Sequence, residues 1–199
     1  MIGVSLLLSL TQFEWAAGAG VVDQQTVPLT IVIYTHSYVD VPRWELQPAI
    51  EQTTRALRAA GILAEWRNQP DHGPAPRPNE LTLLLLSAEM TARKCALEDI
   101  GPRVLGTSAP AAARAWIFLD RVTTVANRLG LAVVDILGQV ITHELGHLLL
   151  GHAAGREAVM REQVLLTGAG YFRFSRKQAE QMQARLRKTE NLVVGALTR

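Results

Sequence analysis

Residues 131–152 read LAVVDILGQVITHELGHLLLGH and hold three of the five histidines of the chain. Apolar residues recur from Leu131 to Leu150 with helical spacing, which predicts an α-helix of about five turns. Gly151 follows at once, and glycine can adopt the left-handed conformation that ends a helix and reverses the chain. A long helix that ends at Gly151 is therefore the central element of the predicted fold.

Two histidines and a glutamate on this helix form a pattern with a defined chemical use. His143 and His147 are four residues apart, so they lie on one helix face and can present two imidazole nitrogens to one zinc ion. A catalytic zinc typically has three protein ligands and one water, whose pKa it lowers to about 7. Glu144 is the predicted general base, which takes a proton from the attacking water and passes it to the departing amine.

His152 is the predicted third ligand. It lies nine residues after His143, and on a continuous helix it would point to the opposite side, because each residue turns the helix by about 100°. A helix end at Gly151 would bring His152 back toward the metal. The alternative is a downstream carboxylate, supplied by Glu157 or Glu162.

The segment from His143 to Met160 resembles the metzincin superfamily of zinc endopeptidases, whose motif is His-Glu-x-x-His-x-x-Gly-x-x-His followed by a methionine turn beneath the metal. Met160 follows His152 by eight residues, which is the interval expected in the matrixin branch. Residues 158–160 (AVM) have the small, apolar and methionine sequence of that turn. The wider resemblance, with residues 171–175 (YFRFS) leading into a C-terminal helix, covers roughly residues 27–187.

Two positions depart from the metzincin pattern. Family members have the glycine three residues after the second histidine and the last ligand ten after the first. Here Gly151 comes four residues after His147, and His152 comes nine after His143. The tyrosine usual two residues after the turn methionine is replaced by Glu162. The segment that leads to the third ligand is thus one residue shorter than in the family.

The resemblance implies an α+β catalytic domain of the zincin type over residues 21–199, in which a twisted mixed β-sheet packs on long helices. It also implies Zn²⁺ as cofactor, a peptide or protein substrate, and Met160 as a support beneath the metal. Two other functions stay open. One is a gluzincin-type zinc peptidase with a downstream glutamate ligand, and the other is a zinc-binding protein without catalysis, against which the presence of Glu144 argues.

The remaining elements follow from periodicity and turn residues. Residues 27–34, 62–66, 81–87 and 116–120 have the composition of strands, and 81–87 is apolar enough to be covered on both faces. Helices are predicted over residues 42–60 and from the capping box at 175–178 to about residue 188. Residues 68–79 form a proline-rich loop, and residues 89–113 receive no firm assignment.

The strand 116–120 (WIFLD) has two interpretations. In metzincin-like proteins the strand before the catalytic helix borders the cleft, so this strand could pair with an extended peptide substrate. It could equally be a strand of the core. His36 and His72 are interpreted as exposed loop residues that do not bind metal.

Composition limits the other functions. The 199 residues are 48% hydrophobic and 19% charged, which is typical of a folded globular protein. The net charge of +2 includes no long basic run, so no nucleic-acid partner is expected. The single cysteine, Cys95, excludes an internal disulfide and a multi-thiolate metal site.

The N-terminal sequence predicts export. Residues 2–10 form a short apolar run, and small residues at 16–20 offer a cleavage site, so residues 1–20 are interpreted as a signal peptide. A secreted or periplasmic protein follows, with a cytoplasmic location as the alternative. The apolar runs at 2–10 and 81–86 are too short to span a bilayer, so no membrane span is expected.

Overall fold

The computed structural model describes residues 28–68, 79–151, 160 and 173–197. A mixed, five-stranded β-sheet lies at its centre, with the strand order β2-β1-β3-β5-β4. The strands are β1 (Leu29–Ser37), β2 (Ile62–Asn68), β3 (Glu80–Leu86), β4 (Gly106–Ala109) and β5 (Arg114–Phe118). The first four strands in this order are parallel, and β4 is antiparallel to β5.

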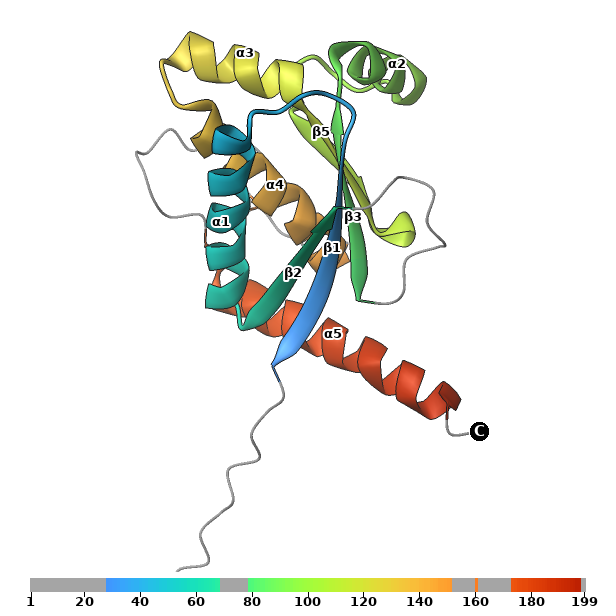
Figure 1. Cartoon of the computed structure of the whole chain (residues 1–199). Coiled ribbons are helices and arrows are strands. Elements are labelled where there is room, and N and C mark those ends of the chain that lie inside the picture. Colours follow the sequence, from blue (N-terminus) through green and yellow to red (C-terminus); the bar gives the residue numbers. More distant parts are fainter. Residues whose placement is uncertain (1–27, 69–78, 152–159, 161–172, 198–199) are drawn as a thin grey trace, which may run out of the picture.

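Helices cover both faces of the sheet (Figure 1). They are α1 (Arg43–Ala59), α2 (Ala88–Glu98), α3 (Leu119–Leu129), α4 (Val133–Leu150) and α5 (Arg176–Leu197), with a short 3₁₀ turn at Pro110–Ala112. The fold is α+β, as predicted, and α2 and α3 are helices that the sequence did not predict.

Strand β3 separates two hydrophobic cores. Leu81, Leu83 and Leu85 belong to the main core, which α1, α4 and α5 share. Leu84 and Leu86 pack on the other face with Cys95 of α2. The prediction that this strand is covered on both faces is confirmed. Because side chains alternate along a strand, such a double burial requires a nearly continuous apolar sequence.

Helix α4 is the central helix of the main core. It begins at Val133 and ends at Leu150, so the predicted stop before Gly151 is confirmed; Gly151 has a positive φ of 60° with ψ −137°, which is not the left-handed helical conformation that was predicted. Among the described helices, α4 alone is long and apolar enough to span a membrane, and 72% of that stretch is buried inside the fold. Its apolar composition therefore matches its place in the core.

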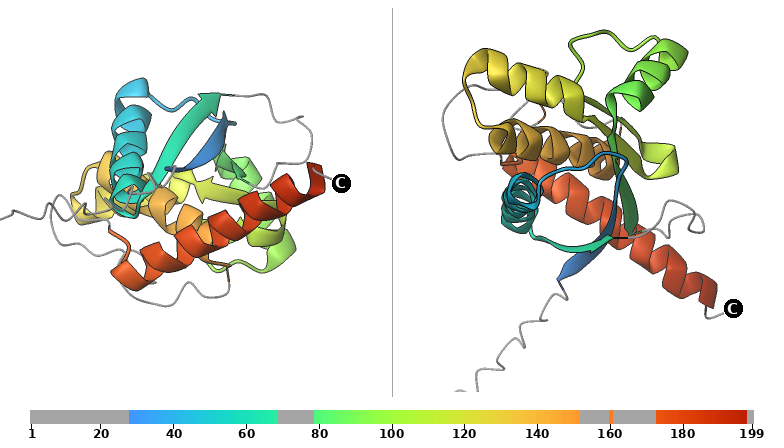
Figure 2. Two further views of the ribbon diagram at one scale, coloured as in Figure 1. Left: turned by 90° about the horizontal axis from the view of Figure 1, so that it is seen from below. Right: turned by 45° about the horizontal axis from the view of Figure 1, so that its top comes forward.

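Helix α5 begins at the predicted capping box. The Ser175 amide donates to the Gln178 side chain at 2.8 Å, and the Gln178 amide donates to the Ser175 hydroxyl at 3.2 Å. The helix ends at Leu197, not near Lys188. Figure 2 shows that α5 crosses beneath α4 and the sheet.

Two other assignments differ from the structure. The unassigned segment 89–113 contains most of α2 and all of β4, and α2 begins where the Ser87 hydroxyl accepts from the Met90 amide. The strand predicted at 116–120 begins at Arg114 and ends at Phe118, because Leu119 and Asp120 already belong to α3. The predicted signal peptide and most of the proline-rich loop lie outside the described residues.

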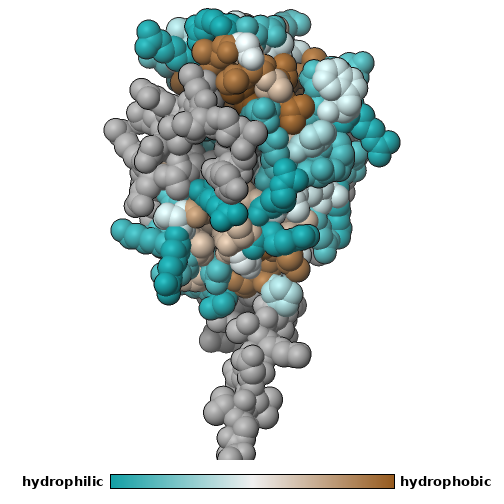
Figure 3. All heavy atoms as spheres, turned by 90° about the vertical axis from the view of Figure 1, so that its left-hand side faces the viewer, coloured by the Kyte–Doolittle hydropathy of each residue, from teal (hydrophilic) through white to brown (hydrophobic). Residues whose placement is uncertain are grey.

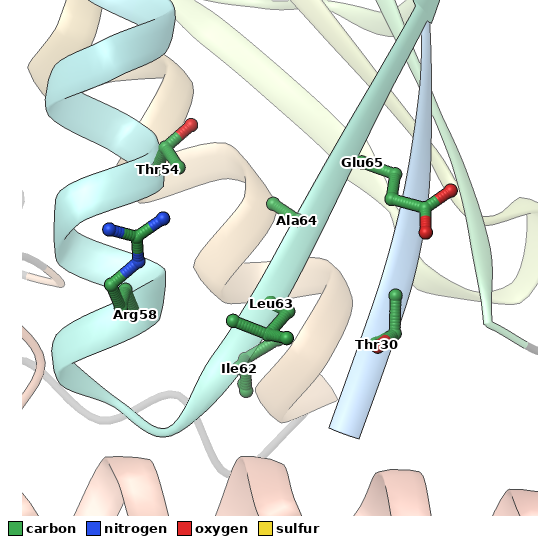
Figure 4. Close-up of a pocket in the computed structure, with 7 residues that line it drawn as sticks. All are labelled: Thr30, Thr54, Arg58, Ile62, Leu63, Ala64 and Glu65. Carbon is green, nitrogen blue, oxygen red and sulfur yellow. The ribbon is translucent and has the colours of Figure 1, made fainter. Parts of the chain in front are cut away.

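A few large apolar side chains are exposed on the described part of the chain. Figure 3 shows one side of the molecule, where hydrophobic residues gather near the top. Trp44 and Leu97 are the most exposed large apolar residues, at 71% and 86%. A hollow between α1 and β2 is lined partly by Thr54, Arg58 and Glu65 (Figure 4) and by none of the predicted site residues.

Candidate metal centre

The two histidine rings of α4 meet in the structure. The Nε2 atoms of His143 and His147 lie 3.1 Å apart, and the ring planes are inclined by 81°. Both rings are half-buried. Residues four apart on a helix share one face, so the helix itself brings the two nitrogens together.

The distance between the two Nε2 atoms fits two ligands of one zinc ion. Two nitrogens bound to one tetrahedral zinc at about 2.0–2.1 Å lie about 3.3 Å from each other, close to the observed 3.1 Å. Burial, followed by the neighbouring His143, lowers the pKa of His147 to about 4. His147 is therefore neutral at pH 7, and the neutral ring is the form that binds metal.

Glu144 lies on the buried side of the same helix turn and is 6% exposed. Burial raises the pKa of this carboxyl to about 7, and a hydrogen bond with the Ser108 side chain partly offsets that rise. A carboxyl with a pKa near the ambient pH can both accept and release a proton. The environment of Glu144 thus suits acid–base chemistry.

Strand β4 contacts Glu144 directly, and sequence reasoning missed it. A Cβ atom built on Gly106 would lie 2.9 Å from Glu144 Cγ. The short sequence GTSA of β4 has no alternating apolar pattern that would identify a strand. The sequence does not indicate that β4 packs on α4, because Gly106 and Glu144 are about forty residues apart.

Met160 packs against α4. It is 1% exposed, and a Cβ atom built on Gly146 would meet its sulfur atom and the ring of Phe174. Gly146 lies between Glu144 and His147 in the sequence. The described contacts are consistent with the predicted support role of Met160, which stays a prediction as far as a metal is concerned.

Buried polar contacts fix α4 against α1. The Thr142 hydroxyl lies 2.7 Å from the Gly138 carbonyl oxygen and 3.1 Å from the Thr53 hydroxyl of α1. The Gln52 amide donates to Asp135 at 3.1 Å. Because Thr142 directly precedes His143, these bonds fix the orientation of α4 about its own axis close to the two histidines.

The third predicted ligand is not placed. His152 and the alternatives Glu157 and Glu162 lie outside the described residues, as does His72. Within the described part of the chain, no three His, Cys, Asp or Glu side chains gather as a metal site. That part therefore supplies two nitrogen donors, and the third donor stays a prediction.

Two other predicted roles are corrected by the structure. His36 lies within β1 and is half-buried, not in a loop. Strand β5 is hydrogen-bonded to β3 on one side and to β4 on the other. Pairing of β5 with a peptide substrate is therefore wrong, because neither edge of this strand is open, and the core interpretation holds.

Comparisons with known proteins give two structural likenesses. No family model and no curated protein match the chain. An archaemetzincin from Methanopyrus kandleri is 16% identical with a TM-score of 0.44, over 80% of this chain and 96% of that chain. A zinc-dependent peptidase from Methanocorpusculum labreanum is 14% identical with a TM-score of 0.41, over 78% and 99%. At these values the likenesses assign no activity to this chain.

Proposed function

We propose that the protein is a zinc-dependent peptidase that hydrolyses internal bonds of peptides or proteins. The observation that carries this proposal is the 3.1 Å separation of the His143 and His147 Nε2 atoms, with Glu144 buried on the same helix turn. A pair of helical imidazoles could serve a structural metal alone. The adjacent buried carboxyl favours catalysis, because a structural site needs no base.

Each residue has a distinct task in this proposal. His143 and His147 would hold Zn²⁺ with His152 as the third ligand, and Met160 would support the helix from below. Zinc supplies Lewis-acid chemistry at such a site, where it polarises a carbonyl and makes water more acidic. Glu144 accepts the proton of the attacking water at its carboxylate and then donates it to the amine that leaves.

The protein environment assists this proton transfer. In the metal-free protein, burial raises the pKa of Glu144 to about 7. A nearby cation favours the ionised carboxylate and lowers the pKa again. Glu144 would therefore be an ionised base when the site is loaded and would hold a proton more readily when the charge nearby decreases.

The proposal is tested first with purified protein. We expect about one zinc per chain by metal analysis, and cleavage of an unfolded protein substrate that stops after treatment with a chelator and returns with zinc. Glu144→Ala should keep zinc and lose at least about a hundredfold in kcat, because general bases contribute about 10²–10⁴. Glu51→Ala, which alters an exposed carboxylate of α1, serves as the control. Equal turnover by Glu144→Ala and the wild-type protein would refute the catalytic proposal.

The ligand set needs a separate test. His152→Ala, Glu157→Ala and Glu162→Ala should be compared by their zinc affinity at equal protein concentration. Loss of zinc only in His152→Ala would support the three-histidine site. Loss in one of the glutamate variants, with retention in His152→Ala, would indicate the gluzincin-type ligand set instead. Zinc retained at full stoichiometry without any peptide cleavage would indicate a non-catalytic zinc protein.

A further inference from the structure

Strand β4 presents alternate side chains to the two sides of the sheet. Gly106 pairs with Ile117, and Ser108 pairs with Ala115. Ile117 and Ala115 are fully buried in the main core that contains α4. Thr107 pairs with Trp116, which packs with the smaller core on the other face. Gly106 and Ser108 therefore face α4, and Thr107 faces away from it.

The backbone of Gly106 lies so close to the Glu144 side chain that only glycine, which has no Cβ atom, fits at this position. A Cβ atom there would lie 2.9 Å from Glu144 Cγ, 3.1 Å from Val140 Cγ1 and 3.0 Å from the Trp116 carbonyl oxygen. Gly106 is not among the residues with positive φ, so its backbone conformation does not require glycine. The close approach of β4 to α4 is the physical reason for glycine at this position.

Ser108 faces α4 from the same side of β4 as Gly106. Its hydroxyl lowers the pKa of the Glu144 carboxyl group, which places the two groups within interaction distance. The flexible glutamate side chain is thus confined at its Cγ atom by the backbone of Gly106, and its carboxyl group lies within reach of Ser108. Such contacts restrict rotamers that an exposed glutamate would sample freely.

The strand that makes these contacts is itself well anchored. The guanidinium of Arg121 in α3 donates to the carbonyl oxygens of Gly101 and Val104, both at 2.8 Å. The Phe118 amide donates to the Leu105 carbonyl oxygen at 2.9 Å. These bonds fix the loop that enters β4, so the strand can act as a rigid support for Glu144.

We infer that β4 positions the catalytic base, with Gly106 giving room for the Glu144 side chain and Ser108 orienting its carboxyl group. The catalytic role of Glu144 rests on the proposed function, whereas the packing of β4 on Glu144 does not depend on it. Ser108 and Gly106 are positioning residues that act through Glu144. Positioning within a few tenths of an ångström matters because proton transfer needs a near-ideal approach of the base to its partner.

A kinetic comparison of neighbouring hydroxyls tests the inference in the zinc-loaded protein. Ser108→Ala should lower kcat at least about tenfold, with KM and zinc content unchanged. Ser108→Thr keeps a hydroxyl and should retain most of the activity. Thr107→Ala removes a hydroxyl from the same strand on the opposite face and should have wild-type kcat. A wild-type kcat for Ser108→Ala, or an equal loss in Thr107→Ala, would overturn the inference.

A double-mutant cycle tests the contact without activity. Thermal unfolding of the zinc-free protein is measured for the wild-type protein, Ser108→Ala, Glu144→Ala and the double variant. We expect the two Tm changes to be non-additive by at least about 2–4 °C, because residues in contact couple. The cycle of Thr107→Ala with Glu144→Ala should be additive. Additivity in both cycles would overturn the inference, whereas a wild-type protein that cleaves no peptide would refute only the proposed function.

Discussion

The sulfur atom of Met160 packs against the Cα of Gly146, one residue before His147. A side chain at position 146 would collide with this sulfur and would lie 2.9 Å from the Phe174 ring. Three segments that are separate in sequence therefore meet at a glycine in the middle of the motif.

Gly146→Ala should destabilise the protein despite the better helix propensity of alanine. Overpacking in a core costs about 1–3 kcal/mol, which exceeds the gain of about 1 kcal/mol from replacing a helical glycine. Urea unfolding measures the difference. Gly101→Ala is the control, because nothing lies within 4 Å of a Cβ atom at that position. If Gly146→Ala is as stable as the control, the close packing of Met160 on α4 is wrong.

Zinc binding should depend on both histidines of α4 and not on His36 of β1. His143→Ala and His147→Ala should each weaken zinc binding by more than about a hundredfold. Loss of a residue that only hydrogen-bonds to a metal ligand already lowers metal affinity about 10–100-fold, and loss of the ligand itself should lower it more. His36→Ala in β1 should bind zinc like the wild-type protein. Competition with a chelating dye gives the affinities. Unchanged affinity in either α4 variant would exclude that histidine as a ligand.

Thr142→Val should destabilise the fold by about 1–2 kcal/mol, because it leaves the buried Thr53 hydroxyl and Gly138 carbonyl with fewer partners. Thr124→Val is a matched control. It removes a similar hydroxyl, 2.8 Å from the carbonyl oxygen four residues earlier, at an exposed site. Denaturant unfolding should show a clear loss only for the buried position, and equal losses would contradict the role of this contact between α1 and α4.

Stability of the zinc-free protein should depend on pH through Glu144. Its pKa is about 7 in the fold against an ordinary value of 4.5, chiefly because of burial. The unfolded chain therefore loses its proton first as the pH rises, so this group favours the fold below pH 4.5 and that contribution is lost up to about pH 7. The difference between these two pKa values corresponds to a loss of about 3 kcal/mol in the free energy of unfolding, at about 1.36 kcal/mol per pKa unit.

Glu144→Gln removes this titration and keeps the shape of the side chain. The variant should therefore gain stability relative to the wild-type protein between pH 4.5 and pH 7, with no further gain above pH 7. His147 titrates in both proteins: its lowered pKa makes the fold lose stability as the pH falls from 6.5 toward 4. The comparison of the two proteins cancels that effect. A stability difference that is constant with pH would show that Glu144 is not buried as described.

Local features of the sequence predicted the elements that carry the histidines. Helical periodicity, a glycine stop and a capping box depend on neighbouring residues, so α4, Gly151 and the start of α5 were predicted within a few residues. The pairing of His143 with His147 follows from the same helical repeat. The apolar run of β3 likewise predicted its double burial, because both faces of the strand needed apolar residues.

Other boundaries could not be read from the sequence. The run WIFLD is apolar across the end of β5 and the start of α3, so composition alone does not mark the change at Leu119. The four residues of β4 have little strand propensity. They form a strand because β5 supplies backbone partners, and sheet pairing depends on segments that local periodicity does not connect.

The sequence by itself determined a helix that presents two imidazoles on one face with a glutamate beside them, because side chains on one helix are related by a fixed repeat. Only the tertiary structure decided what surrounds that glutamate. Gly106 and Ser108 face Glu144 through sheet register, and Met160 packs on Gly146 although it lies beyond the end of α4 in the sequence. These contacts depend on the packing of distant segments, which gives the buried carboxyl its environment and its raised pKa.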